Sequence, residues 1–308
     1  MYGWKKGAGA KGVIGVGKEA HIAVFGDTHG HLRLCLQLCR LWQMEMGVHL
    51  DGVLQCGDFG YFPDVTRLDK ATKRYAKKDP EELGFPRYFG RPEPEKRDVL
   101  VEKILMGSEE SLETLRAPFY WCNGNHEDFV ALAELLEGAG EKSAVAVDFY
   151  ECLFYVPSGN VVELQLDKVG RTLRVGALGG GPGAVDDVGP KFVCPLAGAK
   201  LEDENFHVLL SHCGPAGGDF YGSSEIKSVV QRVQPAFNFF AHYERKIAPF
   251  MVGDSQCFWL SDVKFDRETN GLEEGCMGIL KVTEDGMAFS LVEEPWVLKV
   301  RASSWRYL

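Results

Sequence analysis

The sequence lacks the features that mark several classes of protein. None of its nine cysteines forms a Cys-x-x-Cys pair, so neither a zinc ribbon nor a disulfide framework is indicated. No apolar run approaches the ~18 residues needed to cross a bilayer, and no secretory signal is visible. Positive charge is not in excess, because 34 Lys and Arg face 44 Asp and Glu, and this balance disfavours a protein that coats nucleic acid. We therefore predict a cytoplasmic protein without a membrane segment.

Composition, in contrast, is that of an ordinary globular chain. The sequence has 308 residues, of which 45% are apolar and 25% are charged, and this length suits one large domain or two small ones. Residues 1–20 are rich in Gly and Lys, and we expect them to form a flexible segment before the fold. The strand and helix patterns predict a domain over residues 21–295 and a C-terminal tail over residues 296–308.

Short apolar runs separated by polar clusters indicate the fold class. Residues 21–25 are typical of a buried strand, and apolar residues at helical spacing follow over residues 32–46. Residues 129–136 predict a helix that ends at Gly138, and a polar turn within residues 161–178 predicts a β-hairpin. Helices alternate with strands early and strands dominate later, which predicts an α/β fold of two packed mixed sheets flanked by helices.

Residues that bind metal ions or transfer protons follow several of the predicted strands. Because the carboxyl ends of strands in an α/β sheet meet at one edge, we expect these side chains to converge there. Carboxylate, imidazole and carboxamide groups without thiolates suit hard or borderline divalent cations such as manganese, iron or zinc. The residues are Asp27, His29, Asp58, Asn125, His126, Glu127, His212, His242 and Glu244.

The order of these motifs resembles that of the calcineurin-like metallophosphoesterases. Asp-x-His, Gly-Asp, Gly-Asn-His-Glu and two later strand-end histidines follow one another within residues 20–295. The resemblance implies a four-layer sandwich and a site for two divalent metal ions, with Mn²⁺ favoured and Fe, Zn or Mg as the other candidates. It assigns Asp27 and His29 to the first metal, Asp58 to both, and Asn125, His212 and His242 to the second.

The resemblance also implies an activity. The two ions would generate a hydroxide that attacks a phosphate ester, while His126 protonates the leaving oxygen and Glu127 orients His126 or its loop. Protein phosphatases carry an arginine in the motif Gly-Asp-x-x-Asp-Arg-Gly, and residues 57–63 lack it, so we expect phosphodiesters to be preferred over monoesters. Two alternatives stay open: a protein or nucleotide phosphomonoesterase, and a non-catalytic binding module similar to the phosphoesterase-like subunit of the retromer coat.

The sequence departs from the family pattern at Glu244. The family motif Gly-His-x-His is Ala-His-Tyr-Glu at residues 241–244, so the imidazole expected at the first metal is missing. One interpretation makes the Glu244 carboxylate the replacement ligand, which would favour harder cations such as Mn²⁺ or Mg²⁺. The other turns Glu244 to solvent and leaves the first metal site weak or empty.

A basic and aromatic insertion separates two of the motifs. It spans residues 59–118, and we expect it to form a lid over the metal edge of the sheets. Arg67, Lys70 and Arg74 are candidate contacts to substrate, including a nucleic-acid backbone, because basic and aromatic residues are interleaved there. The alternative is a solvated helical face, since these three residues share helical spacing.

The last two motifs show a second likeness. The residues around His212 and His242 are similar to those of the RNA lariat debranching enzymes. Those enzymes typically carry Cys where this chain has Asp27, so the likeness covers only part of the site.

Overall fold

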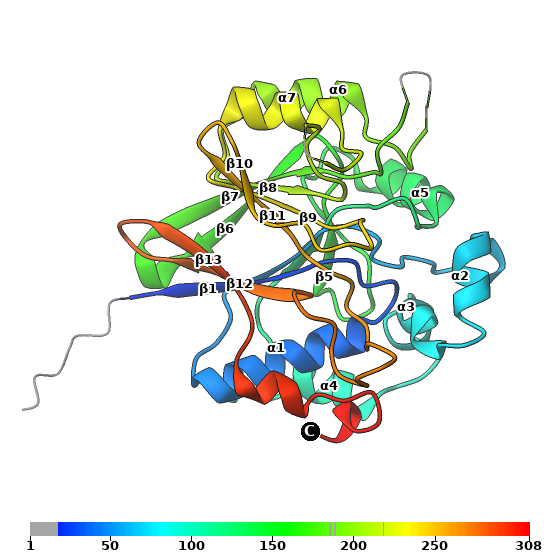
Figure 1. Cartoon of the computed structure of the whole chain (residues 1–308). Coiled ribbons are helices and arrows are strands. Elements are labelled where there is room, and N and C mark those ends of the chain that lie inside the picture. The colour runs from blue at the N-terminus through cyan, green and yellow to red at the C-terminus, as the bar shows by residue number, and fades with distance from the viewer. Residues whose placement is uncertain (1–17, 185–186, 188, 218) are drawn as a thin grey trace, which may run out of the picture.

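Two mixed β-sheets packed face to face form the centre of the molecule (Figure 1). The computed structural model describes residues 18–184, 187, 189–217 and 219–308. Most of the predicted flexible segment, residues 1–17, lies outside these residues. The two sheets and the helices on their outer sides confirm the predicted fold class.

The larger sheet contains seven strands in the order β13-β12-β1-β2-β3-β5-β4. Strands β1, β2, β3 and β5 run parallel, while β12 and β4 pair antiparallel with their neighbours. The carboxyl ends of β1, β2 and β3 therefore lie side by side at one edge. The strands are β1 (Ala20–Phe25), β2 (Gly52–Gln55), β3 (Phe119–Trp121), β4 (Val145–Ala146), β5 (Leu153–Tyr155), β12 (Met277–Val282) and β13 (Met287–Leu291).

The smaller sheet contains six strands in the order β10-β11-β9-β8-β7-β6. Strands β7, β8, β9 and β11 run parallel, and β6 and β10 are antiparallel edge strands. The hairpin predicted within residues 161–178 is confirmed as β6 and β7. The strands are β6 (Asn160–Leu166), β7 (Arg171–Leu178), β8 (Val208–Ser211), β9 (Phe237–Phe240), β10 (Phe250–Val252) and β11 (Ser255–Trp259).

Alternating side chains of β1 explain how the layers are held together. Ile22 and Val24 point into the apolar layer between the two sheets, where they join residues of β8 and β9. Ala23 and Phe25 point to the opposite face, into the apolar layer beneath helix α1 (Leu32–Met46). Because both faces of the strand are buried, burial of apolar surface fixes the register of β1 and with it the position of the loop that follows.

Helices cover the outer face of each sheet (Figure 1). Helices α1, α3 and α4 contribute to the apolar layer on the larger sheet, and α6 and α7 form that on the smaller sheet. Among the described residues, no helix is both long and apolar enough to span a bilayer. The helices after α1 are α2 (Lys70–Tyr75), α3 (Gly84–Tyr88), α4 (Val99–Met106), α5 (Phe129–Ala139), α6 (Pro195–Glu202) and α7 (Ser224–Val233). Short 3₁₀ turns are found at Val65–Arg67, Pro80–Leu83, Asp167–Val169, Pro295–Lys299 and Trp305–Tyr307.

Helix α5 extends beyond its predicted end. It continues through Gly138 and stops at Gly140, which has a φ of 67°. A glycine ends a helix where the backbone turns to positive φ, and Gly138 keeps helical geometry instead. The predicted end at Gly138 is therefore wrong by two residues.

The C-terminal segment, residues 296–308, packs into the domain and does not extend from it as a tail. Trp296, Val300 and Trp305 are buried in the apolar layer that contains α1. The side-chain amide of Gln37 also donates a hydrogen bond of 3.0 Å to the backbone carbonyl of Trp305. These three large apolar side chains stabilise the packing of the segment against α1. Their spacing follows no regular helix or strand period, so the sequence pattern did not indicate this packing.

Candidate metal centre

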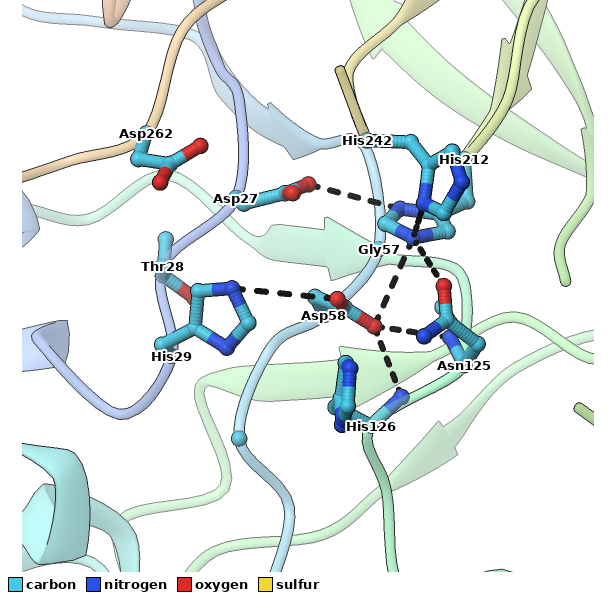
Figure 2. Close-up of polar contacts among 12 residues, drawn as sticks. Asp27, Thr28, His29, Gly57, Asp58, Asn125, His126, His212, His242 and Asp262 are labelled. Carbon is cyan, nitrogen blue, oxygen red and sulfur yellow. Dashed lines mark hydrogen bonds and ion pairs between the residues drawn. The ribbon is translucent and has the colours of Figure 1, made fainter. Parts of the chain in front are cut away.

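The predicted motif residues come together at one edge of the two sheets (Figure 2). They lie in the loops that follow β1, β2, β3, β8 and β9, where parallel strands end. His29, Asp58 and His242 have φ values of 41°, 46° and 71°. Positive φ is uncommon for residues with side chains, and it is found most often where function requires a strained backbone. These turns aim the three side chains into the same space.

One half of the site is built around His212. Its Nε2 lies 3.0 Å from Asn125 Oδ1, 3.1 Å from His242 Nδ1 and 3.5 Å from Asp58 Oδ1. Its Nδ1 lies 3.1 Å from the Cys56 carbonyl, which can only accept a hydrogen bond. Nδ1 therefore carries a proton, and whenever the ring is neutral the lone pair of Nε2 faces other atoms with lone pairs. Such a cluster is typical of a cation site.

The pKa of His212 also indicates that the surrounding carboxylates favour positive charge at this position. Burial alone would lower the pKa of this imidazole, but the carboxylates of Asp58 and Asp27 raise it to about 9. A second proton on the ring therefore offsets the negative charge in the metal-free protein. A divalent cation can take its place, so the donor set fits a metal ion.

The other half of the site contains Asp27 and His29. One donor atom each from Asp27, His29 and Asp58 lies within 4.8 Å of the other two. Asp27 is buried, and its Oδ1 has no hydrogen-bond partner; the contact of 3.3 Å to His212 Nδ1 does not provide one, because that proton goes to Cys56. Burial raises the pKa of Asp27 to about 6, although His212 opposes this rise. An unpaired buried carboxylate oxygen costs stability, so this half also fits a cation.

Asp58 belongs to both halves. Its Oδ2 lies 3.7 Å from His29 Nε2 and its Oδ1 lies 3.5 Å from His212 Nε2. Burial alone would raise the pKa of Asp58, but the adjacent histidines lower it to about 2, so the group is ionised. The backbone N–H groups of Asn125 and His126 donate to Oδ1 at 2.7 and 2.8 Å. Gly124 makes this approach feasible, since a Cβ there would lie 2.0 Å from Asp58 Oδ1.

His126 is held by a residue that sequence reasoning missed. Its Nδ1 lies 2.8 Å from Oδ2 of Asp69, which also caps the N-terminus of α2 by accepting a bond from the Thr72 N–H. The hydrogen bond to Asp69 raises the pKa of His126 to about 9. Asp69 lies in the insertion, 57 residues before His126, and no motif marks it. The tertiary fold alone forms this pair.

Glu127 holds a loop in place. Its carboxylate accepts bonds from the backbone N–H groups of Phe59, Gly60 and Tyr61 at 2.7, 3.1 and 2.7 Å. These residues directly follow Asp58. Of the two roles considered for Glu127, the contacts favour orientation of the loop, and the loop in question is the one that carries Asp58.

A cavity of about 780 Å³ opens over the motif residues. Helix α2 of the insertion, with Arg74, and Lys78 just after the helix form part of its wall, and the loop after β11 forms another part. The insertion thus borders the site, as predicted for a lid. Two of the three basic candidates lie elsewhere: Lys70 is exposed and does not line the cavity, and the guanidinium of Arg67 is 2.8 Å from Asp128.

The predicted helical face of basic residues is divided between two elements. Arg67 ends a 3₁₀ turn, while Lys70 and Arg74 belong to α2. Asp69 starts α2 between them because its side chain caps the helix. Helical spacing across residues 67–74 therefore does not reflect one continuous helix.

Two carboxylates lie at the rim of the first half. Glu244 is exposed and lines the cavity, and neither Glu244 nor Asp262 belongs to the close group of Asp27, His29 and Asp58. Asp262, from the loop after β11, lines the same cavity and points toward Asp27 (Figure 2). Sequence reasoning missed Asp262, although the rule that found the other residues applies to it: it follows a strand that runs parallel to β9.

A comparison with protein families agrees with the motifs. A profile of the calcineurin-like phosphoesterases matches residues 20–243. The structure is similar to that of TT1561 of Thermus thermophilus, with 12% identity, a TM-score of 0.46, and coverage of 88% of this chain and 98% of that one. It is also similar to a structure described as a novel phosphatase of Mycoplasma pneumoniae, with 10% identity, a TM-score of 0.45, and coverage of 94% and 100%. No curated protein matches the sequence.

Proposed function

This chain belongs to the calcineurin-like phosphoesterase family, and from that premise we propose that it is a metal-dependent hydrolase of phosphate esters that prefers phosphodiesters. The observation that carries the proposal is the position of Asp58. Its carboxylate faces a group of donors on each side and accepts a hydrogen bond from the backbone N–H of His126, the residue proposed as the acid. A two-metal phosphoesterase needs these parts in this arrangement.

The metal ligands follow from the two halves of the site. Asp27 and His29 would hold the first ion, and the second would be held by Asn125, His212 and His242, with Asp58 shared. Bound there, two divalent ions, with Mn²⁺ favoured by the mixed oxygen and imidazole donors, would supply Lewis-acid chemistry for the phosphate and for a water molecule. His212 presents Nε2 to this space because its Nδ1 proton is donated to the Cys56 carbonyl.

His126 acts as the general acid. Its Nδ1 proton is donated to Asp69, which fixes the ring at the cavity wall and favours the charged imidazolium. The proton on Nε2 is then available to the leaving oxygen of the ester. Asp69 is a positioning residue, because it acts through His126.

The choice of diester over monoester has two supports. Residues 57–63 lack the arginine with which protein phosphatases bind a monoester. The cavity of about 780 Å³ is also large enough for a substituent on each side of a phosphate. A non-catalytic module on the same fold would not require the hydrogen bond between His126 and Asp69, so we favour the enzyme.

Turnover and metal content together test this function. The purified protein is stripped of metal, refilled with Mn²⁺, and assayed with bis-p-nitrophenyl phosphate and p-nitrophenyl phosphate. We expect two ions per chain and faster turnover of the diester. Lys70→Ala, at an exposed position outside the cavity, serves as the control and should match the wild type. A folded protein that binds no metal and turns over neither compound would show a binding module instead.

A further inference from the structure

The two halves of the site are unequally supplied with ligands. Besides the shared Asp58, the second half has three candidate donors, whereas the first has Asp27 and His29 alone. A divalent ion of the manganese type takes more donors than these. The residue that would add one by sequence order, Glu244, is exposed. The structure offers a different carboxylate.

Asp262 is held beside Asp27 by the backbone. The N–H of Val263 donates a hydrogen bond of 2.7 Å to the Asp27 carbonyl, and the N–H of Ser261 donates one of 3.1 Å to Gly275. The segments around Gly26 and Ser261 approach so closely that a Cβ at Gly26 would lie 2.1 Å from the Ser261 carbonyl oxygen. The residue between 261 and 263 is therefore fixed next to Asp27 by its neighbours on both sides, independently of its own side chain.

Asp262 and Asp27 place two carboxylates in the same cavity. Asp27 Oδ1 is buried without a hydrogen-bond partner and faces His212, and Figure 2 shows Asp262 on the other side of Asp27. A divalent cation would satisfy the unpaired oxygen and remove the repulsion between the carboxylates.

Lys264 supplies a partial substitute for that cation. Its Nζ lies 2.6 Å from Asp262 Oδ2, and the lysine side chain is 48% exposed. An exposed ammonium on a flexible stem is easily displaced. It balances the charge of Asp262 in the metal-free protein, and it can move into solvent when a metal ion arrives.

We propose that Asp262, and not Glu244, is the carboxylate ligand that replaces the missing imidazole of the first metal site. The inference rests on the proposed function, since it assumes that the cavity holds two metal ions. An oxygen donor at this position makes the first site harder than the usual family site, and it favours Mn²⁺ or Mg²⁺ over Zn²⁺ there.

Metal content and Mn²⁺ titration separate the two carboxylates. Asp262→Asn and its matched control Glu244→Gln are each loaded with Mn²⁺, and bound metal is measured together with the electron paramagnetic resonance spectrum. We expect Asp262→Asn to bind one ion per chain and to lose the spectral coupling between two neighbouring ions. Glu244→Gln should keep two coupled ions. Two ions in both variants, or a loss in Glu244→Gln alone, would overturn the proposal.

A variant at Lys264 tests the proposal without touching a ligand. If Lys264 competes with the first ion for Asp262, Lys264→Gln should lower the dissociation constant of that ion by about 2–5-fold. An unchanged constant would contradict the competition. The wild type separates a failure of the proposed function from a failure of the role of Asp262. A wild-type protein without metal and without turnover would refute the proposed function. Two ions in Asp262→Asn would refute only the role of Asp262.

Discussion

The cavity is lined by two regions, which differ in whether their residues belong to the family motifs. The inner wall consists of the loops after β1, β2, β3 and β9, which carry family motifs, and His212 from the loop after β8 is buried behind them. The outer wall consists of α2 from the insertion and the loop after β11, which carry no motif. Side chains of the inner wall contact one another directly, as His212 does with His242. From the outer side, Asp69 contacts His126, and Asp262 is the ligand proposed for the first metal. Under the proposed function, the inner wall would supply the acid and most of the metal ligands, and the outer wall would add one ligand and the residue that positions the acid.

The largest effect should follow from the inner-wall residue that both halves share. Asp58→Asn should reduce turnover to background and release both metal ions, because a neutral amide cannot balance two cations. Metal analysis and diester hydrolysis measure both effects. Asp64→Asn is the control, since Asp64 caps a short helix outside the cavity and Asn caps equally well. Two ions retained in Asp58→Asn would show that Asp58 is not a bridging ligand.

A smaller effect is expected from the acid of the inner wall. His126→Ala should lower kcat by about 10²–10⁴-fold while both ions stay bound. The loss should be smaller for p-nitrophenyl esters than for alkyl esters, because only the alkoxide needs a proton to leave. Steady-state kinetics with the two leaving groups provide the measurement. Equal losses on both would mean that His126 binds the phosphate and does not protonate the leaving group.

Substitution of Asp69, the outer-wall partner of His126, should reduce turnover less than substitution of His126. Asp69→Asn should lower kcat by about 10–100-fold with KM and metal content unchanged, since the amide still caps α2 but no longer stabilises the imidazolium. Kinetics on an alkyl diester measure this loss, with Asp64→Asn again as the matched cap. A loss as large as that of His126→Ala would place Asp69 on a level with the inner wall and would remove the distinction between the two walls.

The smallest effect should come from the basic side chains of α2. Arg74→Ala should raise KM for an anionic diester by about 2–10-fold, in the range of an exposed charge contact, and leave kcat unchanged. Lys70→Ala is the internal control, because Lys70 is on the same helix but outside the cavity. A rise in KM for both variants would indicate a diffuse electrostatic effect of the insertion, without a specific contact at Arg74.

The sequence by itself determined the two-sheet fold and the inner wall. The apolar runs that predict strands are local, and each motif directly follows such a run, as Asp27 follows β1. Because parallel strands place their carboxyl ends at the same edge, correct strand prediction was sufficient to bring these residues together. The family motifs then indicated which of them would bind metal.

Only the tertiary structure decided the outer wall. The pair of Asp69 and His126 joins residues 57 positions apart, and the position of Asp262 depends on the backbone bond from Val263 to Asp27. Neither contact has a local sequence pattern, because each arises where an irregular loop closes over an edge that the sheets have already formed. The packing of Trp305 against α1 has the same origin. Local periodicity indicates which segments are strands, but contacts between loops depend on how the whole chain folds.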